Sequence, residues 1–258
     1  MILRTNTIDS LMIFTDQGRM YRLLVNDIPE GTNTSTGQPI KALVEMEPSE
    51  KPAIIYSIYR DTDAKYVFFT TKNGTVKKTS LEEYISTKKK SGITAINLRE
   101  GDSLASVCLI KDEDIILLTK DGMGIKFNSL DIGATSRTTI GIKGIAMKDS
   151  DEVVAALPVR NKNDKLAVFT STGAGKKLDL AELPVQKRGG KGLICHKATA
   201  TAGTIAGAAL VSDEDNILLC GNKTGICISA TEIPATSRAS LGNQMLKGNS
   251  VLLSVSKV

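Results

Sequence analysis

The chain has 258 residues, 41% of them hydrophobic, with a formal net charge of +5 and a sequence pI of about 8.9. This length suits one large or two ordinary domains with a sizeable core. No long apolar run predicts a membrane span or a secretory signal, so we expect a cytoplasmic protein without a membrane partner. The mildly basic charge fits a nucleic-acid partner without requiring one.

Taken in chain order, five segments share one pattern: an apolar run, a threonine or other polar residue, two more residues, and then a glycine. Each of these segments is predicted to form a β-hairpin. The turn dipeptides Asn73-Gly74 and Asp121-Gly122 are typical of β-hairpins, since glycine readily adopts the positive φ that such turns need. The pattern recurs about every 50 residues, which indicates a repeat architecture. The hairpins are Ser10–Leu23, Lys65–Thr79, Asp114–Phe127, Lys165–Leu178 and Asn216–Ser229, and their glycines are Gly18, Gly74, Gly122, Gly173 and Gly225.

Apolar segments before and after each hairpin bring each repeat to about four short strands. The expected fold is therefore an all-β radial array of about five four-stranded blades. A full domain with a sixth blade is the alternative. Short helical turns are expected at Ser80–Tyr84 and Asp179–Leu183. The last segment, Ser250–Lys257, is expected either to close the ring beside the first repeat or to begin a sixth blade. Residues 1–258 are predicted to form one domain with repeats at approximately 1–50, 51–103, 104–152, 153–203 and 204–258.

A cation follows four of the five hairpin glycines by four residues. One such cation would be an ordinary solvated strand residue, whereas four of five predict a patterned cationic face. Ser229 breaks the pattern, which predicts weaker binding by the fifth repeat. The four candidate binding residues are Arg22, Lys78, Lys126 and Lys177.

A second glycine closes a polar loop after each hairpin, and equivalent loops in a ring would lie around one rim. Four of the five loops carry Lys or Arg together with hydroxyls and glycines, a mixture that suits phosphate oxygens. The loops are Gly31–Gly37, Ser86–Gly92, Thr135–Gly141, Gln186–Gly192 and Thr236–Gly242. Their candidate binding residues are Lys88, Lys89, Lys90, Arg137, Gln186, Lys187, Arg188, Gly189, Gly190, Lys191, Gly192 and Arg238.

The loops lack aromatic residues, which argues against single-stranded binding by base stacking. Most of them also lack Asn or Gln beside Arg, which argues against base reading. The sequence favours contact with the backbone of duplex DNA around a curved surface. The alternative is that these are ordinary solvated surface loops.

The stretch Gln186–Gly192, QKRGGKG, resembles the glycine-rich "GyrA box" QRRGGKG of the C-terminal domain of DNA gyrase A, with Lys187 in place of the first Arg. Thr15–Glu30, Thr70–Tyr84 and Ser136–Ile145 also resemble blades of that domain, so the resemblance covers nearly the whole chain. It implies a β-pinwheel, a propeller-like ring with strands exchanged between blades. It also implies that duplex DNA bends around the basic rim in support of ATP-dependent negative supercoiling.

The same resemblance implies which partners and cofactors to expect. The partners would be duplex DNA, the N-terminal breakage-reunion domain of the same polypeptide, and the B subunit of the topoisomerase. ATP and magnesium would belong to other parts of the enzyme, with no cofactor in this domain. A gyrase-type and a topoisomerase IV-type domain stay as alternatives, because the box-like stretch lies in the fourth repeat whereas the family's box lies in the first blade.

Two other classes of protein are weighed against this interpretation. A protein-interaction propeller of the WD-repeat kind carries tryptophan signatures, and this chain has no tryptophan. A propeller enzyme needs clustered carboxylates, histidines or metal ligands at the ring centre. The only histidine is His196, and the four cysteines, Cys108, Cys195, Cys220 and Cys227, form no CxxC pair. We therefore expect neither a metal site nor independent catalysis, with Cys108 and Cys220 as small buried hydrophobes of a reducing compartment.

Overall fold

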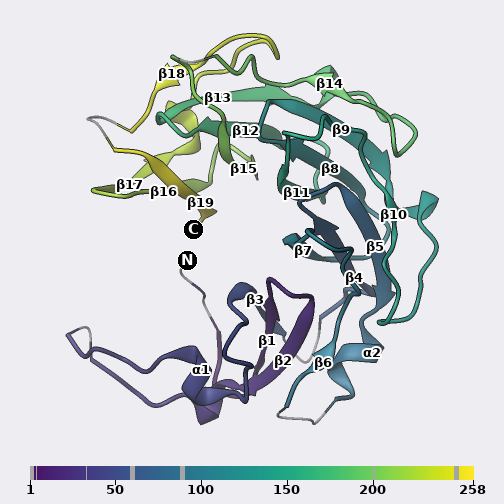
Figure 1. Cartoon of the computed structure of the whole chain (residues 1–258). Helices are drawn as coiled ribbons and strands as arrows, with labels where there is room; N and C mark the ends of the chain where they lie inside the picture. The colour runs from purple at the N-terminus through teal and green to yellow at the C-terminus, as the bar shows by residue number, and fades with distance from the viewer. Residues whose placement is uncertain are drawn as a thin grey trace.

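The chain forms an open ring of five small antiparallel sheets in a computed structural model that describes residues 3, 5–32, 34–58, 62–87, 91–199, 201–246 and 250–258. The sheets stand around the ring as blades, and the C-terminus lies near its middle (Figure 1). Within the described residues, no helix is long and apolar enough to cross a membrane. The predicted all-β radial repeat is confirmed.

Each blade is built on one predicted hairpin, with an inner strand on one side and, in four blades, a two-residue outer strand on the other. In the order from inner to outer strand, the first blade is β3 (Pro52–Ile58), β1 (Ser10–Thr15), β2 (Arg19–Leu24) and β6 (Ile93–Thr94). The second is β7 (Leu104–Ile110), β4 (Tyr66–Thr71), β5 (Thr75–Ser80) and β10 (Ile142–Lys143). The third is β11 (Val153–Val159), β8 (Asp114–Thr119), β9 (Met123–Asn128) and β14 (Leu193–Ile194).

The fourth blade is β15 (Ile205–Val211), β12 (Lys165–Thr170), β13 (Ala174–Asp179) and β18 (Asn243–Gln244). The fifth is β19 (Leu252–Lys257), β16 (Asn216–Gly221) and β17 (Gly225–Ser229).

Short helical turns follow the hairpins, as predicted for the second and fourth. They are η1 (Val25–Asp27), α2 (Glu82–Ile85), η2 (Ser129–Asp131), η3 (Leu180–Glu182) and η4 (Ala230–Glu232), and a further helix, α1 (Ile40–Leu43), precedes β3.

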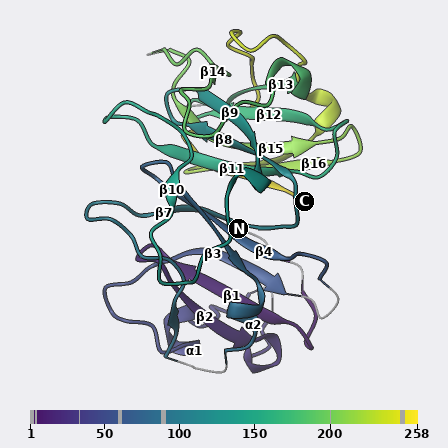
Figure 2. The same cartoon turned by 90° about the vertical axis from the view of Figure 1, so that its right-hand side faces the viewer.

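Strand exchange links the blades. The outer strand of each four-stranded blade comes from the repeat that follows in the chain, as when Ile142 pairs with Val76 and Leu193 pairs with Gly124. A segment of each later repeat therefore lies along the outer edge of the blade before it, as Figure 1 shows for β10 beside β5 and for β14 beside β9. Figure 2 shows the same ring from the side. This arrangement is the pinwheel that the resemblance implied.

The fifth blade departs from the prediction in two ways. Its sheet has three strands among the described residues and lacks the outer strand that the following repeat supplies in the other blades. Both expectations for Ser250–Lys257 are wrong, since β19 within this segment pairs with β16 and forms the inner strand of the fifth blade.

Glycines at the hairpin turns have the expected conformation in four repeats. Gly18, Gly74, Gly122 and Gly173 have φ values from 77° to 94°. Gly225 is not a turn glycine. It pairs with Cys220 in the hairpin ladder, as Gly175, two residues after the turn glycine Gly173, pairs with Phe169. The sequence pattern therefore places the fifth repeat two residues out of register, and the residue equivalent to Lys177 is Cys227 rather than Ser229. Ser229 instead caps η4, as Asp179 caps η3.

Apolar clusters between neighbouring blades hold the ring together. Between the first and second blades, the rings of Phe14 and Phe69 meet edge-on with centroids 5.5 Å apart, and Tyr84 packs against both. Aromatic pairs in this arrangement add stability beyond their buried area. Similar clusters of buried aliphatic residues occur along the ring, so each blade is packed on the next and the outer loops have a rigid support.

Candidate nucleic-acid interface

The cations four residues after the hairpin glycines connect neighbouring blades. Each donates a hydrogen bond to a backbone carbonyl at or beside the helical turn of the next blade. Lys78 Nζ lies 2.9 Å from Ser129 O, and Lys177 Nζ lies 2.9 Å from Ala230 O. The equivalent bonds, from Arg22 Nη1 to Ile85 O and from Lys126 Nζ to Leu180 O, measure 2.6 and 2.9 Å.

Burial decides the role of these cations. Lys78 is 4% exposed and Lys177 is 6% exposed, while Arg22 and Lys126 are half-buried. Burial lowers the pKa of Lys78 and of Lys126, as expected for ammonium groups withdrawn from water. The burial of Lys78 and Lys177 argues against a cationic face at these two positions, and all four residues form ties between blades. The residue in the same place of the last blade, Cys227, is exposed, since no further blade covers it within the described chain.

The third, fourth and fifth second-glycine loops form arches, each passing over one residue of the hairpin strand in the preceding blade; we call them rim arches. In the third arch (Thr135–Gly141), Thr135 N bonds to Lys78 O at 2.8 Å, and Ile142, directly after the arch, pairs with Val76. The residue between these two contacts, Lys77, lies under the arch. The fourth arch (Gln186–Gly192) passes in the same way over Ile125, and the fifth (Thr236–Gly242) over Lys176.

The closing glycines let the arches lie against the strands. A side-chain carbon on Gly192 would lie 2.3 Å from Gly124 O, and on Gly242 it would lie 2.5 Å from Gly175 O. Both glycines also have positive φ, at 72° and 75°. Any other residue would push the arch outward or strain its backbone. In the second loop (Ser86–Gly92), the ring of Tyr21 lies under Gly92, and the candidate residues Lys88, Lys89 and Lys90 lie outside the described residues.

Three arginines occupy the same place in successive arches. Each donates from Nη1 to a carbonyl of the outer strand that ends the previous arch: Arg137 to Thr94 O at 3.3 Å, Arg188 to Lys143 O at 3.2 Å and Arg238 to Ile194 O at 3.3 Å. Carboxylates hold two of these residues by their backbone, since the amides of Arg137 and Arg238 donate to Glu83 Oε2 and Glu182 Oε2. The arginines therefore lie in sequence along one edge of the ring.

The fourth arch is the most cationic of the described arches. Lys187 and Lys191 are exposed, while Arg188 is half-buried. Gly189 adopts a φ of 80° and donates from its amide to Gly144 O at 2.7 Å, which holds the arch against the neighbouring segment. The arch thus presents two exposed ammonium groups and one anchored guanidinium, a combination that suits phosphate oxygens.

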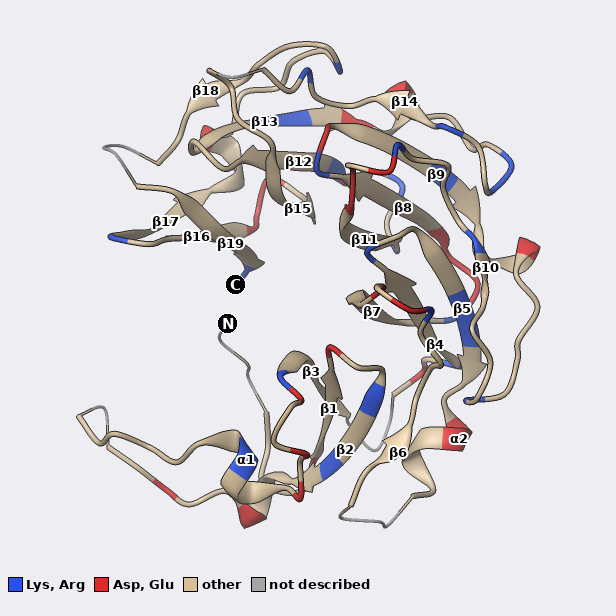
Figure 3. Ribbon diagram, viewed as in Figure 1, with Lys and Arg blue, Asp and Glu red and all other residues tan. Residues whose placement is uncertain are grey.

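Other cations lie beside the arches and were missed at the level of sequence. Lys143, in β10, is exposed next to the fourth arch, and its position two residues after the second glycine Gly141 was the available signal. Lys148 and Lys197 line a hollow of about 400 Å³ together with Lys191. Figure 3 shows Lys and Arg distributed along the outer loops beyond β9 and β14, on the edge that carries the arches.

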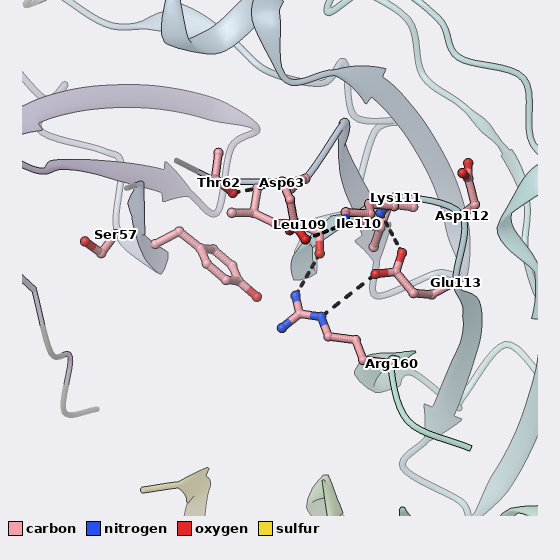
Figure 4. A pocket seen from close by; sticks show the side chains of 11 residues that line it. Ser57, Thr62, Asp63, Leu109, Ile110, Lys111, Asp112, Glu113 and Arg160 are labelled. Carbon is pink, nitrogen blue, oxygen red and sulfur yellow. Dashed lines mark hydrogen bonds and ion pairs between the residues drawn. The ribbon is translucent and has the colours of Figure 1, made fainter. Parts of the chain in front are cut away.

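The ring interior holds a pocket of about 730 Å³ whose charges are paired (Figure 4). Lys111 forms an ion pair with Asp63 and lowers the pKa of that carboxyl, and Arg160 Nε lies 4.0 Å from Glu113 Oε1. Burial raises the pKa of Tyr56, so its hydroxyl stays protonated. Asp63 and Glu113 are thus each held beside a cation.

The family described as the DNA gyrase C-terminal domain, beta-propeller, matches residues 9–45, 65–108, 113–160 and 164–212. These segments make up more than half of the chain, which therefore belongs to that family of type II topoisomerase domains. The A subunit of DNA gyrase from Lawsonia intracellularis is 36% identical over 241 residues, 92% of this chain and 29% of that protein. The same protein from Clostridium acetobutylicum is 35% identical over 247 residues, 95% of this chain and 30% of that protein. The chain thus spans about three tenths of the length of these relatives.

Two solved structures share the fold across almost the whole chain. The C-terminal domain of DNA topoisomerase IV superposes with a TM-score of 0.87 at 28% identity, covering 98% of this chain and 80% of that one. The DNA gyrase A C-terminal domain superposes with a TM-score of 0.84 at 29% identity, covering 98% and 83%. The recognition of this family from the QKRGGKG stretch and the repeated blades is confirmed.

Proposed function

We propose that this domain binds duplex DNA along the outer rim and bends it without sequence preference. The observation that carries the proposal is the placement of Arg137, Arg188 and Arg238 at equivalent points of successive arches on one edge of the ring. A duplex that follows this edge would meet an arginine at each of these three arches. Because the arches carry charge, hydroxyls and glycine amides without aromatic residues, they are suited to the DNA backbone.

The energetics allow such bending. Six described cations on or beside the arches are exposed or half-buried: Arg137, Lys143, Lys187, Arg188, Lys191 and Arg238. If all six engage phosphates, log K should fall with log salt concentration with a slope of about −5. Bending 20–30 bp of duplex by 40–90° costs roughly 1–6 kcal/mol. Counterion release by six contacts exceeds that cost at low salt and weakens at high salt.

In the whole enzyme, we propose that the bent DNA is presented to the strand-passing core and supports ATP-dependent negative supercoiling by a gyrase. The domain would contribute no catalysis and hold no cofactor of its own. Its partners would be the N-terminal breakage-reunion domain of the same polypeptide and the B subunit of the topoisomerase, in the cytoplasm. The names of the relatives that match over 92% and 95% of this chain support this context.

A topoisomerase IV-type role is the second candidate, because a solved topoisomerase IV C-terminal domain has the same fold at a TM-score of 0.87. The two candidates separate when the natural full-length protein is assayed with its partner on relaxed, supercoiled and catenated circular DNA. Net negative supercoiling in the presence of ATP supports the gyrase role, whereas relaxation and unlinking alone support the topoisomerase IV role.

The DNA-bending proposal predicts that the affinity for duplex DNA falls steeply with salt concentration and is nearly the same for unrelated DNA sequences. Affinity for several unrelated duplexes of about 40 bp should agree within a few-fold and should fall by about 10³-fold between roughly 50 and 200 mM salt. Gel-shift titration gives the slope, and energy transfer between dyes at the duplex ends gives the bend. Salt-independent binding, or a bound duplex whose ends do not approach each other, would contradict the proposal.

A further inference from the structure

Two lysines under the arches are almost completely buried although each carries an ammonium group. Lys77 and Lys176 are both 1% exposed. They occupy the same position in the second and fourth blades, because Lys77 pairs with Phe69 and Lys176 pairs with Val168 in equivalent registers. The corresponding residue in the third blade is Ile125, which shows that the fold does not require a cation at this point.

Each buried ammonium binds carbonyl oxygens of the arch above it. Lys176 Nζ donates to Ser237 O at 3.1 Å, Arg238 O at 2.5 Å and Ser240 O at 2.7 Å. Three acceptors match the three donors of a charged ammonium group. Lys77 Nζ donates to Arg137 O at 2.6 Å and to Ala95 O at 2.9 Å. In both arches, therefore, the buried lysine binds the backbone carbonyl of the arch arginine, Arg137 or Arg238.

Three consecutive carbonyls of the third arch are hydrogen-bonded within the protein. Besides Arg137 O, the carbonyl oxygens of Thr138 and Thr139 accept from Asn97, at 2.6 and 3.1 Å. By contrast, no described residue accepts the amide hydrogen of Thr138 or of Ala239, its equivalent in the fifth arch. With their carbonyls bonded within the protein, the arches leave amide donors for an external acceptor, an arrangement typical of anion-binding loops.

The two kinds of arch differ in the position of their charge. The fourth arch has three cations of its own over Ile125, whereas the third and fifth arches have a single arginine each over a lysine. The buried ammonium therefore adds positive charge beneath the two arches that carry little at the surface. Low local polarity strengthens that field at the arch surface.

We infer that Lys77 and Lys176 are positioning residues for phosphate binding: each buried ammonium holds its arch with the carbonyls inward and the arginine and free amides outward. This inference rests on the proposed function and adds to it two phosphate-binding loops, at Ser136–Gly141 and Ser237–Gly242. The phosphate would contact the amides and the arginine rather than the lysine itself.

The charge state of these lysines gives the inference a pH dependence. Burial lowers the pKa of Lys77 and of Lys176 to about 8, whereas an ordinary lysine titrates near 10.4. Glu83 and Arg137 face Lys77, while Glu182, Cys195, His196 and Arg238 surround Lys176. Above about pH 8 the arches lose this charge, and Lys176 loses one of its three donors.

The effects on stability and on binding have opposite signs. Between about pH 8 and 10, the unfolded chain binds more protons at these lysines than the folded one, so their contribution to the free energy of unfolding rises with pH. Affinity for an anion falls over the same window, because the charge beneath the arch disappears. Deprotonation of these two lysines therefore does not unfold the protein near pH 9.5, and any loss of DNA binding that it causes has to come from the lost charge.

The decisive experiment measures duplex affinity at constant salt between about pH 7 and 9.5. For the unaltered protein, affinity should fall roughly tenfold as the two charges are lost. The variant Lys77→Met/Lys176→Met should bind more weakly at neutral pH and show a flatter profile. The control Lys162→Met/Lys223→Met, which removes two exposed lysines outside the arches, should keep the fall with pH.

A second measurement needs neither DNA nor a variant. In the free protein, the amide NMR shifts of Thr138 and Ala239 should titrate with a midpoint near pH 8, while that of Lys187, in the arch over Ile125, should stay flat. Steep salt-dependent DNA binding with a flat pH profile and flat shifts would overturn the inference and leave the proposed function standing. Absence of duplex binding at neutral pH and low salt would overturn both.

Discussion

Replacing Lys187, Arg188 and Lys191 together with alanine should weaken duplex binding by roughly 100-fold at about 0.1 M salt and reduce the salt slope by about 2 to 3. The two lysines are exposed on the fourth arch, and Arg188 lies among them with its guanidinium bonded to Lys143 O. The full effect of three phosphate contacts would be larger, but part of the Arg188 guanidinium is already engaged within the protein. The bend should decrease as well, because the fourth arch lies between the other two arginine-bearing arches.

The fold should survive this triple change, since the arch is held by Gly189 N on Gly144 O and by Gln186 N on Lys126 O rather than by the three side chains. A matched control removes the same charge elsewhere: Lys51→Ala/Lys162→Ala/Lys223→Ala, three exposed lysines outside the arches. The control should lose only the small long-range contribution of net charge to binding. Equal losses in both triple variants would assign the effect to net charge and remove the special role of the fourth arch.

Replacing Lys78 and Lys177 together with methionine should lower the free energy of unfolding by about 3–5 kcal/mol and the midpoint of thermal unfolding by roughly 10 °C. Each change leaves a buried carbonyl, Ser129 O or Ala230 O, without the donor that now reaches it at 2.9 Å. The two sites lie in different blades and should contribute additively. The loss is a large part of the stability of an ordinary domain.

The control for this pair is Lys72→Met/Lys120→Met. Both lysines contact Glu152 at 3.1 Å, but their side chains are 49% and 45% exposed, so the expected loss is within about 1 kcal/mol. Thermal unfolding followed by calorimetry compares the two double variants, and gel shift at low temperature compares their DNA binding. If the Lys78/Lys177 variant were as stable as its control but had lost DNA binding, these lysines would be DNA contacts and not ties between blades.

The fold could be predicted from the sequence because its signals are local and repeated. Turn glycines such as Gly74 and Gly122, each followed by a cation four residues later, define a hairpin wherever they occur. The partner of each outer strand could not be predicted, because β10 pairs with a hairpin strand far earlier in the chain and only two residues form the ladder. In the fifth repeat, Gly225 stands two residues beyond the turn position, and a sequence pattern alone does not distinguish the two glycine positions.

The loops of the candidate interface could be predicted from repeated glycines, whereas the roles of the neighbouring strand lysines could not. The arches and their arginines follow from the second glycines, which are needed wherever the loop contacts a strand. The adjacent lysines Lys77 and Lys78, and likewise Lys176 and Lys177, look alike in the sequence. Strand alternation places the first of each pair under an arch and the second against the next blade. Which face is covered depends on the neighbouring blade, so the burial of all four became visible only in the structure.

The most direct test of the central claim is a map of where each arch touches one bound duplex. A photo-cross-linking residue placed at Thr138, Lys187 or Ala239 reports on the third, fourth or fifth arch, and one at Lys162, in the loop after the innermost strand β11, serves as the control. We expect the three arches to cross-link to successive positions along the same duplex, in the order third, fourth, fifth, and Lys162 to give no product. Cross-links as strong from Lys162, or arch positions that map to the duplex in no consistent order, would contradict a rim that bends DNA.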